Sequence, residues 1–164
     1  ATYGLRPIEI KYLEVRENGK KALWCTFQKK AGGGTSKPRR LWPLHPNWES
    51  DWNLIERVEN QDPLPPAKGG VGDAAGKFLA RNPVWKKLKA EEPDVVPKSF
   101  RHSFAKRGHL DYEIPDTMMA SYMGHTLEVH HLSYLQWSTR EKTQEAAYEE
   151  ALRRKLLTSK DHLV

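Results

Sequence analysis

Three kinds of residue in this chain could together do chemistry on a phosphodiester. Near the C-terminal end, a Gly-His pair (Gly124, His125) is followed nine positions later by Tyr134. Upstream, KSFRHSF carries Arg101, and TYGLRPIEI near the start carries Arg6. Guanidinium groups match the non-bridging oxygens of a phosphodiester, which gain negative charge during attack. A phenol becomes a nucleophile where cations stabilise its anion. These residue types therefore indicate metal-free attack on a phosphodiester.

The neighbours of the two arginines support this interpretation. Glu9 follows Arg6 by three residues, so on a helix it lies on the same face and can orient the guanidinium. Lys98 and Arg101 likewise share a face, whereas His102 points about 100° away from it, and either Arg101 or His102 could be a partner of the phosphate. On the same helix we expect Phe100 and Phe104 to form the apolar stripe, with Arg101 at its edge.

The histidines near these residues admit several roles. His125, after a helix-ending glycine, could donate to a phosphate oxygen or share a proton with the nucleophile, or it could be a turn histidine with no role. His102 is best interpreted as a packing histidine. The spacing of His130 and His131 from His125 fits a zinc site poorly, so we expect no metal.

The nucleophile and the proton donor each have alternatives. Tyr134 could instead be an interfacial aromatic, the commoner role of a tyrosine, and Tyr122 is a rival nucleophile that we interpret as core. A leaving alkoxide needs a proton, which Lys29 or Lys30 at a hairpin tip could supply as general acid.

Composition narrows the class of protein. The 164 residues fit one domain, and the net charge of +6 favours a polyanionic partner such as nucleic acid, although a solvated basic face is the alternative. The single cysteine, Cys25, lies in an apolar run and is best interpreted as a small buried hydrophobe. It excludes an intrachain disulfide and favours a reducing compartment. No apolar run has the length of a membrane span.

Local patterns predict a mixed fold that is mostly helical. The apolar spacing predicts a helix over 4–15, with Pro7 in its first turn, then a turn at Asn18-Gly19. Two strands of a hairpin with a long glycine-rich tip are expected at 21–30 and 39–44. Asn47 is the expected cap of a helix over 48–59. Further helices are expected at 71–82, 84–92, 98–109, from about residue 114, and at 139–157.

A break in the helix near residue 124 is required by the chemistry. Nine residues of straight helix would place His125 and Tyr134 on opposite faces. Gly124 is a plausible helix-ending residue and Thr126 a plausible N-cap of the next helix. With that break, His125 lies in the turn and Tyr134 on the following helix.

Taken together, these residues resemble the catalytic domain of the tyrosine recombinases, the phage-type integrases. The family's T-G-L-R-x-x-E stretch has its counterpart in TYGLRPIE, with Arg6 and Glu9. The lysine that the family carries on a β-hairpin corresponds best to Lys30, with Lys29 as the alternative.

The remaining motifs of the family follow in order. KSFRH matches H-x-x-R-H at Arg101 but has Lys98 in place of the first histidine. MGH matches the family's Leu-Gly-His at His125, and Tyr134 stands where the nucleophile is found, nine residues later. The likeness covers essentially the whole chain.

The resemblance implies an α+β, mostly helical catalytic core that breaks and rejoins DNA, with a small antiparallel sheet near the N-terminus. Residues 1–164 would be a single catalytic domain, and the family's N-terminal DNA-clamping domain and first catalytic helices would lie outside them. Site-specific recombination would proceed through a 3′-phosphotyrosyl link at Tyr134, without metal, nucleotide or other small-molecule cofactor. Arg6, Arg101 and His125 would stabilise the transition state, Lys30 would protonate the leaving oxygen, and Lys98 would assist at the phosphate.

The resemblance also sets the expected partners. They are double-stranded DNA and, for the full-length protein, a homotetramer on paired DNA sites, with no membrane. The apolar face of the last helix, formed by Ala146, Ala147, Leu152 and Leu156, is the candidate for packing on a neighbouring protomer or on its own. We expect a cytoplasmic protein of a bacterial host or one associated with the nucleoid. Two alternatives stay open: a decayed integrase that only binds DNA, and a type IB-like topoisomerase.

The residue at position 98 gives a first test. Lys98→His restores a group that titrates near neutral pH, so we expect it to preserve or raise the yield of covalent protein–DNA adduct on a denaturing gel. Complete loss of the adduct would mean that the lysine has a required role of its own.

Overall fold

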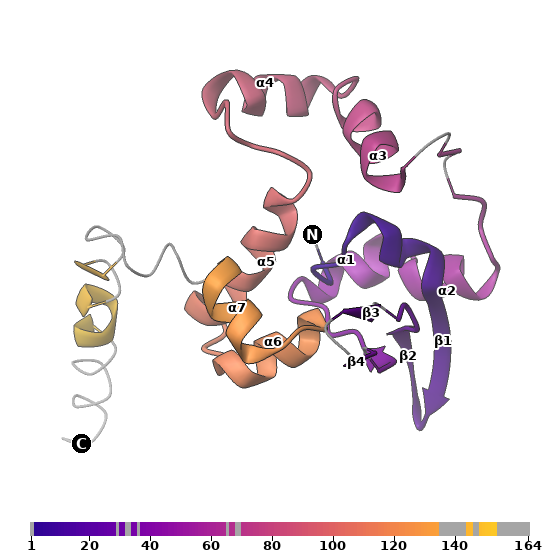
Figure 1. The fold of residues 1–164 in the computed structure, drawn as a ribbon, viewed down its shortest axis with the longest axis horizontal. Helices are drawn as coiled ribbons and strands as arrows, with labels where there is room; N and C mark the ends of the chain where they lie inside the picture. Colours follow the sequence, from indigo (N-terminus) through magenta and orange to yellow (C-terminus); the bar gives the residue numbers. More distant parts are fainter. Residues whose placement is uncertain are drawn as a thin grey trace.

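The protein combines a small sheet with a larger number of helices (Figure 1). The computed structural model describes residues 2–28, 30–31, 34–35, 37–64, 66–67, 70–134, 144–145 and 148–153. Within this part the chain is α+β and mostly helical, as predicted, with a three-stranded antiparallel sheet in its N-terminal part. The sheet lies with α1 and α2 on the right of Figure 1, and α5, α6 and α7 gather on the left.

The helix predicted over 4–15 is wrong in extent and type. Only Pro7–Tyr12 is helical, as the 3₁₀ helix η1, and Leu13–Asn18 is strand β1. Leu13, one of the apolar residues whose spacing suggested a helix, instead lies on this strand. That strand forms because the Asn18-Gly19 turn, which was predicted correctly, folds β1 back antiparallel onto β2 (Lys20–Cys25).

The predicted pairing of the next two strands is confirmed, over a shorter length. β2 pairs antiparallel with β5 (Arg39–Arg40), with Cys25 opposite Arg39, so β2 is the central strand in the order β1-β2-β5. Beyond Cys25 the predicted strand is interrupted, and the hairpin tip forms a separate ladder of β3 (Lys30–Ala31) and β4 (Gly34–Thr35).

The helix predicted over 48–59 is two helices. α1 (Pro46–Asp51) and α2 (Leu54–Glu59) are separated by Asn53, whose φ of 47° is left-handed. α1 begins before the predicted cap: His45 is its N-cap residue and Asn47 lies inside the first turn. Asparagine is one of the few residues other than glycine that adopts this conformation readily, which explains the break.

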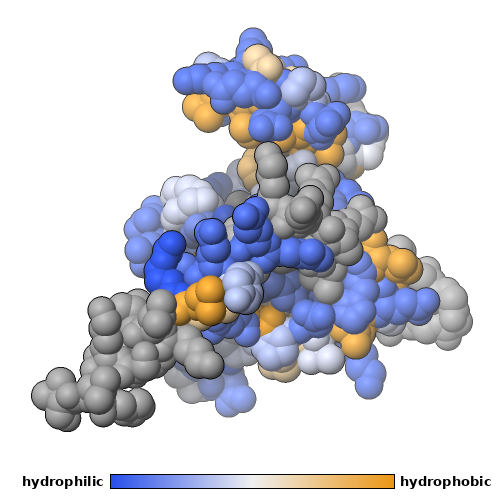
Figure 2. Space-filling view, turned by 90° about the vertical axis from the view of Figure 1, so that its left-hand side faces the viewer, coloured by the Kyte–Doolittle hydropathy of each residue, from blue (hydrophilic) through white to orange (hydrophobic). Residues whose placement is uncertain are grey.

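Two helices form an arm whose first helix contacts η1. α3 (Val71–Leu79) and α4 (Pro83–Glu91) correspond to predicted helices, and the Asn82 side chain caps α4 by accepting from the backbone N–H of Val84 at 2.9 Å. The arm lies at the top of Figure 1, and in Figure 2 its hydrophobic side chains lie below a hydrophilic upper side. Trp85 anchors α4 to α5 by packing on Phe100, with ring centroids 5.5 Å apart.

Three consecutive helices, with the turn between the last two, carry Arg101, His125 and Tyr134. They are α5 (Ser99–Leu110), α6 (Asp116–Met123) and α7 (Leu127–Tyr134). The predicted break between α6 and α7 is confirmed: Gly124 has a φ of 67°, and Thr126 Oγ1 accepts from the backbone N–H of Val129 at 3.3 Å. Asp116 lies in the first turn of α6, where an acidic side chain is favoured by the helix dipole.

Within the described part of the chain, the core is formed by two apolar clusters of buried residues. One gathers the helices around Phe104, and the other lies between the sheet and the N-terminal segment around Leu23. Cys25 is fully buried in the second cluster, and burial raises the pKa of its thiol, as its interpretation as a small hydrophobe requires. Tyr122 packs half-buried against the first cluster.

The apolar face predicted for the last helix falls mostly outside the described residues. Ala146, Ala147 and Leu156 lie there. Leu152 belongs to a described helical stretch and its side chain is 43% exposed.

Gly124 offers a test of the break, with Gly19 as a matched control. Both have left-handed φ angles, but a Cβ on Gly124 would lie 2.6 Å from Nη1 of Arg39, whereas one on Gly19 would meet nothing within 4 Å. Gly19→Ala should cost about 1 kcal/mol of unfolding free energy, and Gly124→Ala roughly 2–4 kcal/mol, because it adds a collision with a held guanidinium. Urea unfolding of both variants measures the difference. Equal losses would mean that Arg39 moves aside freely.

Candidate active site

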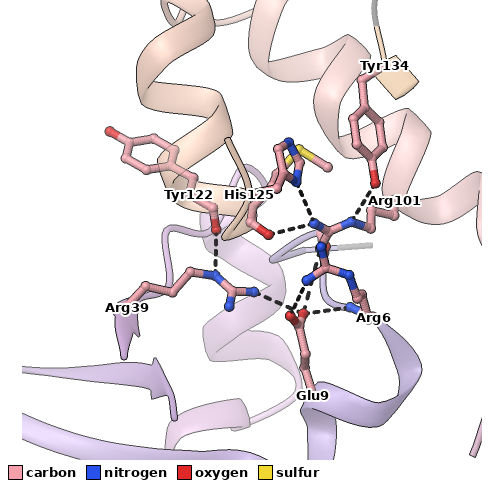
Figure 3. A network of polar contacts seen from close by, with 9 residues as sticks. Arg6, Glu9, Arg39, Arg101, Tyr122, His125 and Tyr134 are labelled. Atoms are coloured by element: carbon pink, nitrogen blue, oxygen red, sulfur yellow. Dashed lines mark hydrogen bonds and ion pairs between the residues drawn. The ribbon is translucent and has the colours of Figure 1, made fainter. Parts of the chain in front are cut away.

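A buried carboxylate organises the site. Glu9 is fully buried, and its two oxygens contact three guanidinium groups (Figure 3). Oε1 lies 2.7 Å from Arg6 Nη1, and Oε2 lies 2.9 Å from Arg39 Nη2 and 3.6 Å from Arg101 Nη1. Burial alone would raise the pKa of Glu9, but the charge of Arg39, the Arg6 backbone N–H and the charge of Arg101 outweigh it, so the pKa lies below its ordinary value. Glu9 is therefore a carboxylate at neutral pH.

The predicted pairing of Arg6 with Glu9 is confirmed in this arrangement. The backbone N–H of Arg6 also donates to Glu9 Oε2 at 2.8 Å, so the carboxylate closes the first turn of η1. The Arg6 side chain is 27% exposed, against 9% for Arg39 and 3% for Arg101, so Arg6 is the most accessible guanidinium of the three.

Arg101 is buried at the centre of the site. The predicted position at the border of an apolar stripe is wrong, because Phe100 is the more exposed residue, at 38%. Arg101 Nη1 donates to the carbonyl of Gly4, and Nη2 donates to the carbonyl of Met123 at 2.5 Å. Burial and the charge of Arg6 lower the pKa of Arg101, against the opposing effect of Tyr134.

Tyr134 and His125 meet on this one guanidinium. Arg101 Nε donates to the Tyr134 hydroxyl at 2.8 Å, and Arg101 Nη2 lies 3.1 Å from His125 Nδ1. The two rings are stacked, with centroids 5.1 Å apart and planes 6° apart. The helix break at Gly124 makes this possible, because His125 lies in the turn and Tyr134 in the last turn of α7.

The electrostatics of the site keep His125 neutral. Burial and the charge of Arg101 lower the pKa of His125 to about 3. Since Arg101 can only donate, His125 Nδ1 accepts this hydrogen bond and carries a lone pair. At neutral pH His125 is therefore an acceptor toward Arg101 and adds no positive charge.

Arg39 belongs to the site although the sequence did not single it out. Its Nε donates to the carbonyl of Tyr122 at 3.0 Å, which joins β5 to α6, and its Nη2 holds Glu9. The available signal was the pair Arg39-Arg40 on a predicted strand, where alternation turns one of two neighbours inward. Three guanidinium groups on one carboxylate leave two positive charges in excess, which suits an anionic ligand.

The predicted lysines are not brought into this cluster by any described contact. Lys98 is exposed at the N-cap of α5, where its charge acts on His102, whose pKa is lowered first by burial and then by Lys98. His102 packs as expected, with its ring centroid 4.9 Å from that of Tyr134. Lys30 is described only by its backbone in β3, and Lys29 lies outside the described residues.

Outside the arginine cluster, the described residues form an apolar cavity but no metal site. No group of three or more His, Cys, Asp or Glu among them is arranged to bind a metal ion. An apolar cavity of about 460 Å³ lies between η1, β1 and α2, lined by residues such as Leu5, Leu13, Leu54 and Val58. Tyr134 and the three arginines of the site do not line this cavity.

Comparison of the chain with models of protein families, with curated proteins and with solved structures finds no match. Among the described helices, none combines the length and the apolar character that a bilayer crossing needs.

Removing the Glu9 charge tests its organising role. Glu9→Gln should lower the unfolding free energy at pH 7 by about 3–5 kcal/mol, because it leaves buried guanidinium groups without their counterion. Glu14→Gln removes the charge from an ion pair with Arg16 whose side chains are 42% and 44% exposed, and should cost less than about 1 kcal/mol.

The Glu9→Gln variant should also change how the unfolding free energy depends on pH in the acid range. A carboxyl with a lowered folded-state pKa stabilises the protein above the pKa of an unfolded glutamate, about 4.3, and loses this effect as the pH falls through the folded-state value. Glu9→Gln should therefore flatten the acid limb of a stability–pH profile measured by urea unfolding. A profile identical to wild type would contradict the central role of Glu9.

Proposed function

We propose that this chain is the catalytic domain of a tyrosine-type DNA strand transferase, a site-specific recombinase that cleaves and rejoins DNA without a metal ion. The observation that carries the proposal is the hydrogen bond from buried Arg101 to the hydroxyl of Tyr134, beside two further arginines. A phenol and a guanidinium in contact supply both the nucleophile and a cation for the phosphate oxygens.

The charge of the site supports a phosphodiester substrate. The excess of two positive charges lies partly buried, where electrostatic interactions are stronger than in water. Arg6 is the guanidinium that a phosphate would meet first, because it is the most exposed. A guanidinium can bind two phosphate oxygens at once, which suits the growing charge of the transition state.

The contacts of Arg101 in the structure are those of the site before a phosphate binds. Each of its nitrogens already has an acceptor: Tyr134 on Nε, Gly4 and Glu9 on Nη1, Met123 and His125 on Nη2. Of these acceptors the phenol is a side-chain hydroxyl on the last turn of α7, whereas two others are backbone carbonyls. A charged phosphate oxygen accepts more strongly than a neutral hydroxyl. An arriving phosphate would therefore replace Tyr134 on Nε and leave the phenol next to the phosphorus.

The reaction then follows as an exchange of phosphoester bonds. The Tyr134 oxygen forms a bond to phosphorus as its proton leaves, and the bond from phosphorus to the 5′-oxygen breaks, which gives a 3′-phosphotyrosyl link. The leaving 5′-oxygen takes a proton, for which Lys30 is the proposed donor, and Lys98 assists at the phosphate. Because the link conserves the phosphoester, the 5′-hydroxyl of a second strand can reverse the step and exchange partners.

The proposed partners follow from this chemistry. The substrate is double-stranded DNA, toward which the net charge of +6 attracts the protein. Exchange between two duplexes requires several active sites at once, so the proposed assembly of the full-length protein is a homotetramer on paired sites.

Loss of the nucleophile tests the proposal. We would incubate the protein with a library of nicked duplexes of random sequence and detect covalent adducts on a denaturing gel. The label is at the 5′ end of the strand that is cleaved, so it stays on the fragment whose 3′ end becomes joined to the tyrosine. Wild type should give a labelled adduct and Tyr134→Phe none, because phenylalanine lacks the attacking oxygen. Tyr122→Phe is the matched control and should keep the adduct, because only the backbone carbonyl of Tyr122 contributes to the network.

Three outcomes would separate the alternatives. An adduct with Tyr134→Phe would show that another residue is the nucleophile. Retarded DNA on a native gel without any wild-type adduct would contradict catalysis and favour a DNA-binding module. Relaxation of supercoiled plasmid without recombined products would favour a topoisomerase.

A further inference from the structure

A chain of histidines leads from the candidate nucleophile to the surface. His125 Nε2 lies 2.9 Å from Nδ1 of His130, and His130 Nε2 lies 2.7 Å from Nε2 of His109. His109 Nδ1 in turn lies 3.1 Å from the carbonyl of Ile114 and 3.4 Å from Oδ1 of Asp116. His130 is fully buried, whereas the Asp116 side chain is 43% exposed.

The direction of every hydrogen bond in this chain follows from its two ends. Arg101 can only donate, so His125 Nδ1 accepts and the ring proton of neutral His125 lies on Nε2. That proton is donated to His130 Nδ1, so the proton of neutral His130 lies on its Nε2 and is donated to His109 Nε2. The proton of His109 then lies on Nδ1 and points to the Ile114 carbonyl, which can only accept.

The surroundings of the rings agree with this assignment. Burial lowers the pKa of His130 to about 4, and the pKa of His125 is lower still, so both are neutral near pH 7. A second proton on His130 would set its Nδ1–H against the Nε2–H of His125 within the 2.9 Å contact, and a second proton on His109 would set two Nε2–H groups against each other within the 2.7 Å contact. One arrangement of protons therefore satisfies all the contacts of the chain at once.

We propose that His130 and His109 are positioning residues that hold His125 in the tautomer with a proton on Nε2 and a lone pair on Nδ1. For its catalytic use this inference rests on the proposed function. In that tautomer Nδ1 accepts from Arg101 Nη2, so His125 helps to hold the guanidinium that donates to the Tyr134 hydroxyl. Donation from His125 Nε2 to a phosphate oxygen is excluded while that proton is held by His130.

The tautomer can be measured without any activity. Long-range proton–nitrogen correlation spectra of protein with ¹⁵N-labelled histidines distinguish a protonated ring nitrogen from one with a lone pair, and His125→Gln identifies the signals of His125. At pH 7 we expect Nε2 of His125 to be protonated and Nδ1 to be unprotonated. A proton on Nδ1, or signals averaged between the two tautomers, would overturn the inference.

Two variants of His130 test its control of the tautomer. His130→Asn keeps an acceptor oxygen close to the position of Nδ1, so the His125 tautomer and the rate of adduct formation should stay close to wild type. His130→Leu removes the acceptor, so the His125 signals should average and adduct formation on the random nicked library should slow at least about tenfold. Near-UV circular dichroism shows whether His130→Leu folds. If it does not, an averaged tautomer in His130→Asn would still contradict the proposal.

The outcomes separate this inference from the proposed function. Wild type with the expected tautomer but no adduct would overturn the function and leave the positioning role of His130 and His109 intact. An adduct together with a proton on His125 Nδ1 would support the function and overturn the positioning role of His130 and His109. A slow His130→Leu variant with an unchanged tautomer would show that His130 acts on packing alone.

Discussion

The buried carboxylate of Glu9 is the interaction on which the rest of the site depends. A fully buried charge is costly unless it is paired, and here Arg6, Arg39 and Arg101 satisfy it from η1, β5 and α5. These elements are far apart in the sequence, so the ion network forms only when the sheet and the helical half of the fold come together. The cluster thus joins the two halves and concentrates positive charge at one place.

The position of Arg101 turns this cluster into a candidate reaction centre. Its guanidinium is held by backbone carbonyls of Gly4 and Met123, so little freedom is left to it. Tyr134 and His125 are then aligned on a fixed cation rather than on a flexible surface side chain. A group held in place before the substrate arrives stabilises developing charge with little reorganisation during the reaction. The left-handed turn at Gly124 is what allows both residues to reach it.

The sequence predicted those parts of the structure that depend on local rules. The turn at Asn18-Gly19, the helix end at Gly124 and the cap at Thr126 each follow from conformational preferences of one or two residues, and each is present. Predictions from apolar spacing alone were less successful. The pattern of residues 4–15 fits a helical stripe, but pairing with β2 makes part of it a strand, and Asn53 divides a helix that spacing predicts as continuous. The spacing of apolar residues along one segment does not show which other segment it will pair with.

For the site, residue types and spacing are enough to show which chemistry is available: two arginines, a histidine and a tyrosine at spacings that suit attack on a phosphodiester. The burial of Arg101, the addition of Arg39 and the continuation of the network through His130 and His109 become visible only in the folded chain. The reason is physical. Residue type sets what a side chain can donate, accept or attack, whereas burial, tautomer and shared counterions arise from contacts between segments that no local pattern brings together.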